Sequence, residues 1–188
     1  RSYFNAPGLL ALSKDLKNWE FLGEAFPERA VCIIPKKING KYWAYYGNAD
    51  VYVSWSEDLR TWHTERQVVV DRRPGMFDEH ICEGVAAPIY SENGILFLYN
   101  GATKDRANFD YVKKLGITEY LAHRTESIYS IGWALFDKND PLKLIARCEE
   151  PVLEPTELYE LFGHTGFTVF GCGLVNFKGK YHLYYGCN

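Results

Sequence analysis

Short segments of this chain repeat, and these repeats limit the possible folds more than any other feature. Residues 40–47 (GKYWAYYG) recur at 179–186 (GKYHLYYG), with a looser copy at 94–101 (GILFLYNG). A second unit, residues 13–19 (SKDLKNW), recurs 43 residues later at 56–62 (SEDLRTW). Repeats of about this length are typical of stacked supersecondary units. Aromatic, alternating strands with glycine at each end are typical of propeller blades. The sequence therefore predicts an all-β propeller with a central pocket.

The strand pattern predicts about three blades and little helix. A strand, turn and strand are expected over residues 8–24, and residues 71–84 are expected to be a polar loop between blades. Further strands are expected near residues 30–36, 41–47, 51–56, 62–69, 85–90, 95–100, 121–136, 168–176 and 180–186. We expect residues 1–188 to be one propeller domain, an excerpt of a longer protein without its N-terminal blades and final closing strand.

Charge and composition narrow the classes of partner. The net charge of −3 comes from interspersed acids and bases, a pattern that indicates no nucleic-acid surface. No apolar run approaches the roughly 18 residues of a membrane-spanning helix, so we expect no membrane association. A soluble protein, intracellular or periplasmic, is expected. Aromatic residues make up 16% of the chain; they suit half-buried strands and also the flat walls of a sugar site.

Cysteine and histidine spacing indicates neither a metal nor a cofactor. The five cysteines are odd in number and lack any CxxC pairing, so free, mostly buried thiols are expected. They are Cys32, Cys82, Cys148, Cys172 and Cys187. The five histidines are scattered, and the chain has no phosphate loop, nucleophile elbow or zinc motif.

Carboxylates are therefore the main candidates for catalysis. Glu83 lies between Cys82 and Gly84, just before an apolar segment, where burial would raise its pKa towards that of a general acid. Glu126 interrupts the predicted strand 121–136, and a glutamate inside a strand needs a partner or a pocket. From the residues alone, an exposed or ion-paired role is open for both.

Five further residues are predicted to line a sugar site. They are polar or aromatic residues at positions expected to face the central funnel, since binding residues concentrate in loops. They are Asp50, Asp78, His80, Asn100 and Tyr185.

The chain resembles glycoside hydrolase family 130 over nearly all of its 188 residues, and residues 129–163 are the most specific part. The motifs that carry the resemblance are YSIGWALFD (129–137), DP (140–141), AR (146–147), PVLEP (151–155) and YELFG (159–163). The repeated Ser-x-Asp-Leu units and residues 35–42 fit the same family. The resemblance implies a five-bladed β-propeller that acts on β-mannosides, with this chain supplying about three blades.

Within that family, the chain departs from the phosphate-binding pattern of the phosphorylases. Gly47, Ile81 and Asn100 stand where that pattern has basic or donor residues. The departures imply the hydrolytic branch, an inverting exo-β-mannosidase for β-1,2 linkages, with Glu83 and Glu126 as acid and base in an order the sequence leaves open. Two alternatives stay open: a β-mannoside phosphorylase that uses inorganic phosphate, and a non-catalytic carbohydrate-binding propeller.

Overall fold

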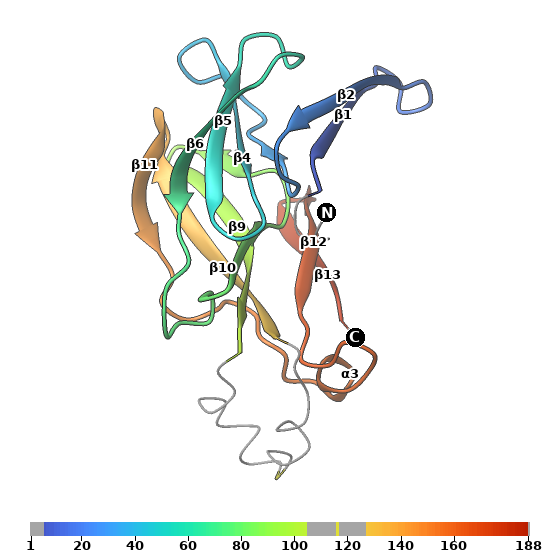
Figure 1. The fold of residues 1–188 in the computed structure, drawn as a ribbon, viewed down its shortest axis with the longest axis vertical. Coiled ribbons are helices and arrows are strands. Elements are labelled where there is room, and N and C mark those ends of the chain that lie inside the picture. Colours follow the sequence, from blue (N-terminus) through green and yellow to red (C-terminus); the bar gives the residue numbers. More distant parts are fainter. Residues whose placement is uncertain (1–5, 105–115, 117–126, 188) are drawn as a thin grey trace.

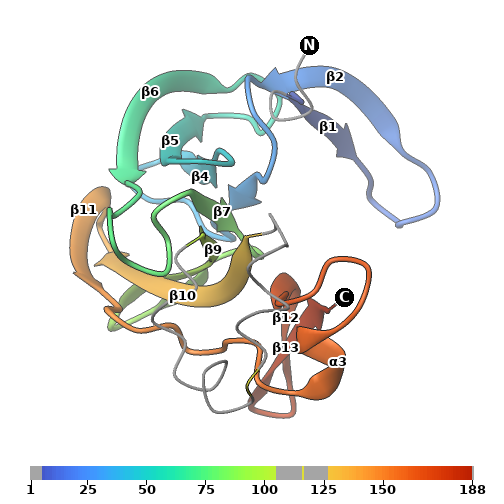
Figure 2. The same ribbon diagram turned by 60° about the horizontal axis from the view of Figure 1, so that its bottom comes forward.

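The structure, a computed structural model, describes residues 6–104, 116 and 127–187. It is almost entirely β-structure, which confirms the predicted class, and its four sheets follow one another along an arc (Figures 1 and 2). The first sheet pairs β1 (Gly8–Leu12) with β2 (Glu20–Phe26). The fourth pairs β12 (Phe170–Phe177) with β13 (Lys180–Gly186). The curled arrangement agrees with a propeller, and the number of five blades stays a prediction.

The second and third sheets are larger. The second has the order β3-β4-β5-β6, and the third has the order β11-β10-β9-β7, with β8 also paired to β9. The bounds are β3 (Cys32–Ile33), β4 (Tyr42–Tyr46), β5 (Val51–Ser56), β6 (His63–Val70), β7 (Ile81–Gly84), β8 (Ile89–Ser91), β9 (Gly94–Thr103), β10 (Ile128–Asp137) and β11 (Asp140–Arg147). A four-residue helix, α3 (Leu158–Leu161), precedes the fourth sheet.

Local turn chemistry accounts for the regular hairpins. Asn39 and Gly40 both have positive φ, at 52° and 78°, as a tight type I′ turn requires. In the first Ser-x-Asp unit, one carboxylate oxygen of Asp15 accepts the backbone N–H groups of Lys17 and Asn18 at 2.9 and 2.8 Å. Asp58 makes the equivalent bonds in the second unit. Each repeated unit is therefore a turn that reverses the chain between two strands.

The prediction that residues 71–84 form a loop is wrong for the last four residues. Ile81–Gly84 is strand β7, and its pairing with β9 places Glu83 opposite Asn100. This polar segment forms a strand because its buried backbone N–H and C=O groups need hydrogen-bond partners, and β9 supplies them. The strand predicted at 85–90 is correspondingly short and begins only at Ile89. Of the strand predicted over 121–136, the part before residue 127 lies outside the described residues.

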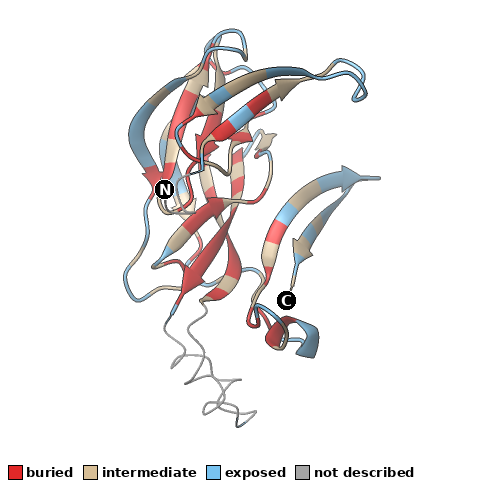
Figure 3. Ribbon diagram, turned by 45° about the vertical axis from the view of Figure 1, so that its right-hand side comes forward, coloured by how far each residue is buried: buried red, intermediate tan, exposed pale blue. Residues whose placement is uncertain are grey.

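Aromatic side chains join the second sheet to the third. The ring of Tyr45 stacks on Phe136 at 4.7 Å and lies 5.0 Å from Phe97. The hydroxyl of Tyr45 donates to the carbonyl of Pro141 at 2.9 Å, so its polar end is also satisfied. Figure 3 shows most buried residues in these two sheets, while β12 and β13 are largely exposed. These two sheets therefore form the rigid core that carries the site.

The described thiols are all free. Cys32, Cys82 and Cys148 are buried, as expected, whereas Cys172 is exposed. Burial raises the pKa of Cys32 and of Cys82 to about 12, which keeps these thiols protonated and unreactive. In the part of the chain that the structure describes, no helix is long and apolar enough to cross a membrane.

Candidate functional site

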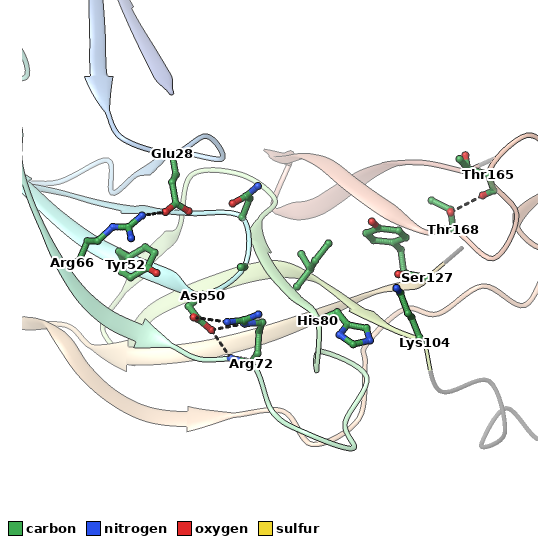
Figure 4. A pocket seen from close by; sticks show the side chains of 14 residues that line it. Glu28, Asp50, Tyr52, Arg66, Arg72, His80, Lys104, Ser127, Thr165 and Thr168 are labelled. Atoms are coloured by element: carbon green, nitrogen blue, oxygen red, sulfur yellow. Dashed lines mark hydrogen bonds and ion pairs between the residues drawn. The ribbon is translucent and has the colours of Figure 1, made fainter. Parts of the chain in front are cut away.

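A cavity of about 800 Å³ opens where loops of the second, third and fourth sheets meet. Most of its lining residues have polar or charged side chains, and Figure 4 shows those from Glu28 to Thr168 arranged around it. The lining residues are Glu28, Asn48, Ala49, Asp50, Tyr52, Arg66, Arg72, His80, Ile81, Lys104, Ser127, Tyr129, Thr165 and Thr168. A cavity of this size with convergent polar groups is a typical small-molecule site.

Two arginine–carboxylate pairs form one wall of the cavity. Arg66 from β6 donates to Glu28 and also lies over the ring of Tyr52, 5.2 Å from its centroid. The guanidinium of Arg72 holds Asp50 with two bonds of 3.0 and 3.2 Å, and the backbone N–H of Arg72 adds a third at 3.0 Å. Burial opposes ionisation of Asp50, but the bonds from Arg72 outweigh it and lower its pKa. Asp50 is thus held as an anion by its counter-ion, Arg72.

Glu83 is a buried carboxylate beside this cavity. It is only 6% exposed, and Arg29 donates to it from Nε at 3.0 Å and from Nη2 at 3.5 Å. Burial raises the pKa of Glu83, and Arg29 only partly opposes that effect. The ring of Tyr129, which lines the cavity, is close enough that the charge on Glu83 adds to the burial that raises the pKa of Tyr129. A glutamate with these properties is suited to deliver a proton.

The structure places two of the predicted sugar-binding residues, Asp50 and His80, on the cavity wall. Two others, Asp78 and Asn100, are fully buried and do not line the cavity. Asp78 has no exposed surface and accepts bonds from Arg73 at 2.7 Å, Arg147 at 2.6 Å and the hydroxyl of Tyr99 at 2.8 Å. It belongs to the core, because two guanidinium groups that are largely withdrawn from water need its charge.

Asn100 is also fully buried, and its side-chain amide makes two hydrogen bonds to the backbone of one glycine. Its Nδ2 donates to the carbonyl of Gly171 at 3.1 Å, and its Oδ1 accepts the Gly171 N–H at 2.7 Å. Asn100 therefore ties β9 to β12, and it is fully buried and does not line the cavity. The prediction of a sugar contact assumed a loop position, whereas Asn100 lies inside a strand.

Tyr185 and Glu126 complete the predicted set. The hydroxyl of Tyr185 donates to Glu160 at 2.7 Å, and this bond raises the pKa of Tyr185. Tyr185 thus packs against the segment that contains α3 and does not line the cavity. Glu126 lies outside the described residues. Within the described residues, no group of three or more His, Cys, Asp or Glu side chains is placed to hold a metal ion.

Sequence reasoning missed several cavity residues, notably Glu28, Tyr52, Arg66, Arg72 and Lys104. Most lie at strand ends or in short connections, where polar residues usually face only solvent. One available signal was the recurrence of charged residues just after β2, β6 and β9. Strand ends of neighbouring blades gather around one axis, so such residues meet there.

Comparison with known proteins agrees with the resemblance. The sequence profile of the family described as beta-1,4-mannooligosaccharide phosphorylase, glycoside hydrolase family 130, matches residues 24–188. A curated relative, the beta-1,2-mannobiose phosphorylase of Listeria innocua, is 36% identical over 98% of this chain and 48% of its own length. This chain therefore spans about half the length of that relative.

Solved structures agree. A beta-1,2-mannobiose phosphorylase from Listeria innocua, in complex with beta-1,2-mannobiose, superposes with a TM-score of 0.80 at 35% identity, over 98% of this chain and 48% of that one. A second structure has a TM-score of 0.79 at 32% identity, over 94% of this chain and 54% of its own; its description states that the family contains hydrolases that target beta-1,2 mannosidic linkages in Candida mannan. The profile match and these identities show that the chain belongs to glycoside hydrolase family 130.

Proposed function

We propose that the complete protein cleaves β-1,2-mannosidic bonds by phosphorolysis, with inorganic phosphate as acceptor. The name of the Listeria innocua relative supports this reaction, and it favours the phosphorylase alternative over the hydrolase predicted from the sequence. The observation in this chain that carries the proposal is the basic lining of the cavity. Arg66, Arg72, His80 and Lys104 line the cavity together with two carboxylates, Glu28 and Asp50, and this excess of basic groups suits an anionic co-substrate.

Glu83 is the proposed acid. In a single displacement, a phosphate oxygen forms a bond to the anomeric carbon while the glycosidic C–O bond breaks. The departing oxygen then takes a proton from the acid, and the configuration at the anomeric carbon inverts. Burial keeps Glu83 protonated to higher pH than a free glutamate, which supports this role. Arg29 then neutralises the carboxylate that remains after the proton has left.

Hydrolysis is the second candidate, and a specific observation favours it. Gly47, Ile81 and Asn100 carry no cation, and the amide of Asn100 is bound to Gly171. On this alternative, Glu83 and Glu126 would act as the acid and base around a water. Their carboxyl groups should then lie about 6.5–9.5 Å apart, as inversion with a bound water requires.

One experiment separates the candidates. The full-length protein is incubated with β-1,2-mannobiose, with and without phosphate, and the products are identified. Mannose 1-phosphate plus mannose, formed only with phosphate, is the expected result. Mannose alone at a phosphate-independent rate would replace phosphorolysis with hydrolysis. Binding of mannobiose without any turnover would instead indicate a carbohydrate-binding propeller. The same assay on β-1,4-mannobiose tests the linkage, and slower cleavage is expected.

A further inference from the structure

We infer that Asn100 is a positioning residue for Glu83: through its hydrogen bonds to Gly171, it holds β12 against the face of the third sheet that carries Glu83 and keeps water from that carboxyl group. The inference rests on the proposed function, in which Glu83 is the acid. Asn100 is fully buried and does not line the cavity, so it acts only through the position of β12.

Strand register places Glu83 and Asn100 side by side on one face of the third sheet. They are direct partners in the antiparallel ladder of β7 and β9, and such partners share a face with their Cβ atoms about 4.5–5.5 Å apart. Asn100 is in turn the direct partner of Ile131 on β10. Along the chain, Ile81 and Val85 lie two positions before and after Glu83. Apolar side chains therefore flank this polar pair.

The start of β12 covers the same region. Gly171 is buried, and its backbone N–H and C=O groups bind the amide of Asn100 at 2.7 and 3.1 Å. A Cβ atom added to Gly171 would lie 2.8 Å from the methyl groups of Val85 and 3.0 Å from Ile131. Val85, Ile131 and Val169 together form a buried apolar cluster. This close approach leaves no space for water between Gly171 and the two side chains beneath it.

Asn100 supplies the link between the two sheets that lies closest to Glu83. The buried backbone groups of Gly171 need hydrogen-bond partners, and the amide of Asn100 provides both. Two backbone bonds to Tyr129, at 3.0 and 3.1 Å, hold the segment before β12 to β10. These bonds do not involve Asn100, so the segment should stay attached when Asn100 is replaced. Only the contact beside Glu83 should then loosen.

The surroundings of Glu83 indicate what such loosening would do. Arg29 is the cation that binds it, and Cys32 and Tyr129 are the other ionisable groups near enough to interact with its charge. Burial raises the pKa of Cys32 to about 12 and also raises that of Tyr129, so both are neutral where Glu83 titrates. The contact between β9 and β12 adds no ionisable group. Because burial is the largest effect on the pKa of Glu83, water that reached this carboxyl group would lower that pKa.

The test follows the carboxyl carbon NMR resonance of Glu83 against pH in the full-length protein, with the resonance assigned by its absence from Glu83→Gln. We expect the midpoint to move to lower pH in Asn100→Ala, since the vacated space has polar walls that hold water. Gly171→Ala keeps Asn100 but pushes β12 away from Val85, and the same shift is expected. The double variant Gly171→Ala/Val85→Ala removes that clash and should restore most of the midpoint. Gly173→Ala is the matched control on the same strand, because its added Cβ has an ordinary nearest contact of 3.7 Å, and its midpoint should stay unchanged.

The pH profile of kcat/KM for β-1,2-mannobiose gives a second measurement on the same variants. The alkaline limb should move to lower pH in Asn100→Ala and in Gly171→Ala, so that kcat/KM on the alkaline side falls several-fold. A lower midpoint of the carboxyl group with an unchanged profile would leave Asn100 as the residue that positions β12 and remove Glu83 as the acid. Phosphate-independent hydrolysis with both shifts present would leave the inference standing and overturn phosphorolysis.

Two results would overturn the inference itself. One is a midpoint that stays in place or rises in folded Gly171→Ala protein, and this variant decides the question alone if Asn100→Ala does not fold. The other is a shift of the same size in Gly173→Ala, since general loosening of β12 would then explain the effect without Asn100.

Discussion

At the scale of single residues, the balance between burial and hydrogen bonding sets the direction in which the pKa of each carboxyl group shifts. Glu83 and Asp50 are both held by arginines, yet their pKa values move in opposite directions. Asp50 receives three bonds from Arg72, one of them from the backbone, and these outweigh its desolvation. Among the described residues, Glu83 receives side-chain bonds from Arg29 alone, and it is more deeply buried than Asp50, so desolvation dominates. The two carboxylates are thus suited to different tasks, proton delivery and fixed charge.

Replacing Glu83 by Gln should lower turnover of β-1,2-mannobiose about 100-fold or more, because the amide keeps the shape but cannot transfer a proton. The unfolding midpoint should change little, since the remaining partner, Arg29, is 41% exposed. Steady-state kinetics and thermal unfolding measure the two effects. The matched control is Glu92→Gln, an exposed glutamate paired with Lys138, which should keep normal turnover. Near-normal activity of a folded Glu83→Gln protein would contradict the assignment.

The pH profile carries a second prediction about the same pair. If protonated Glu83 is the acid, kcat/KM falls as the pH rises through its raised pKa. Arg29 lowers that pKa, so Arg29→Gln should raise it further and move the alkaline limb of the profile to higher pH. The stability contribution has the same sign: a raised pKa favours the folded state at low pH, and this contribution is lost as the pH rises through the folded pKa. An alkaline limb that stays in place or moves to lower pH would exclude Glu83 as the titrating group.

At the scale of elements, buried charge joins segments that are distant in sequence. Asp78, from the connection between β6 and β7, binds Arg147 at the end of β11 and Arg73 nearer in the chain. The side chain of Arg147 is only 7% exposed, and that of Asp78 has no exposure. Such a cluster stabilises little relative to an apolar core, but removing one member leaves an uncompensated charge. The connection is therefore fixed by the cluster even though it has no regular secondary structure.

Asp78→Asn should reduce the free energy of unfolding by about 3–5 kcal/mol, the usual cost of breaking a buried pair. Urea unfolding followed by tryptophan fluorescence measures the change. Asp71→Asn is a close control, because Asp71 also pairs with Arg147 but is 75% exposed. It should cost less than about 1 kcal/mol, as exposed ion pairs do. Equal losses in the two variants would show that burial does not set the strength of this cluster.

The hairpin glycine offers an independent test at this scale. Gly40 has a φ of 78°, and Gly40→Ala should cost about 1 kcal/mol or more, since alanine tolerates that conformation poorly. Gly173→Ala serves as the control: its φ is not positive, and an added Cβ would meet Tyr184 at an ordinary 3.7 Å. Chemical denaturation of both variants measures the difference. A loss no larger in Gly40→Ala than in Gly173→Ala would contradict the turn argument.

At the scale of the whole molecule, the sequence predicted local features well and spatial neighbours poorly. The turn at Asn39 and Gly40 and the repeated Ser-x-Asp units follow from short-range chemistry. The burial of Asp78 and Asn100 does not, because their partners Arg147 and Gly171 lie 69 and 71 residues away. The cavity wall likewise combines residues as distant as Glu28 and Thr168. Polar residues in an apolar context were recognisable, but whether each faced a ligand or an internal counter-ion depended on the packing of the sheets.

The two hydrogen bonds between the side-chain amide of Asn100 and the backbone of Gly171 restrict how β9 and β12 can move relative to each other. A single side chain donates to and accepts from one residue of the opposite strand, so β9 and β12 cannot slide along each other without breaking both bonds together. Gly171 adds a steric stop, because any larger residue there would strike Val85 at 2.8 Å. The two bonds and this close approach together hold the third and fourth sheets at a fixed spacing at this point.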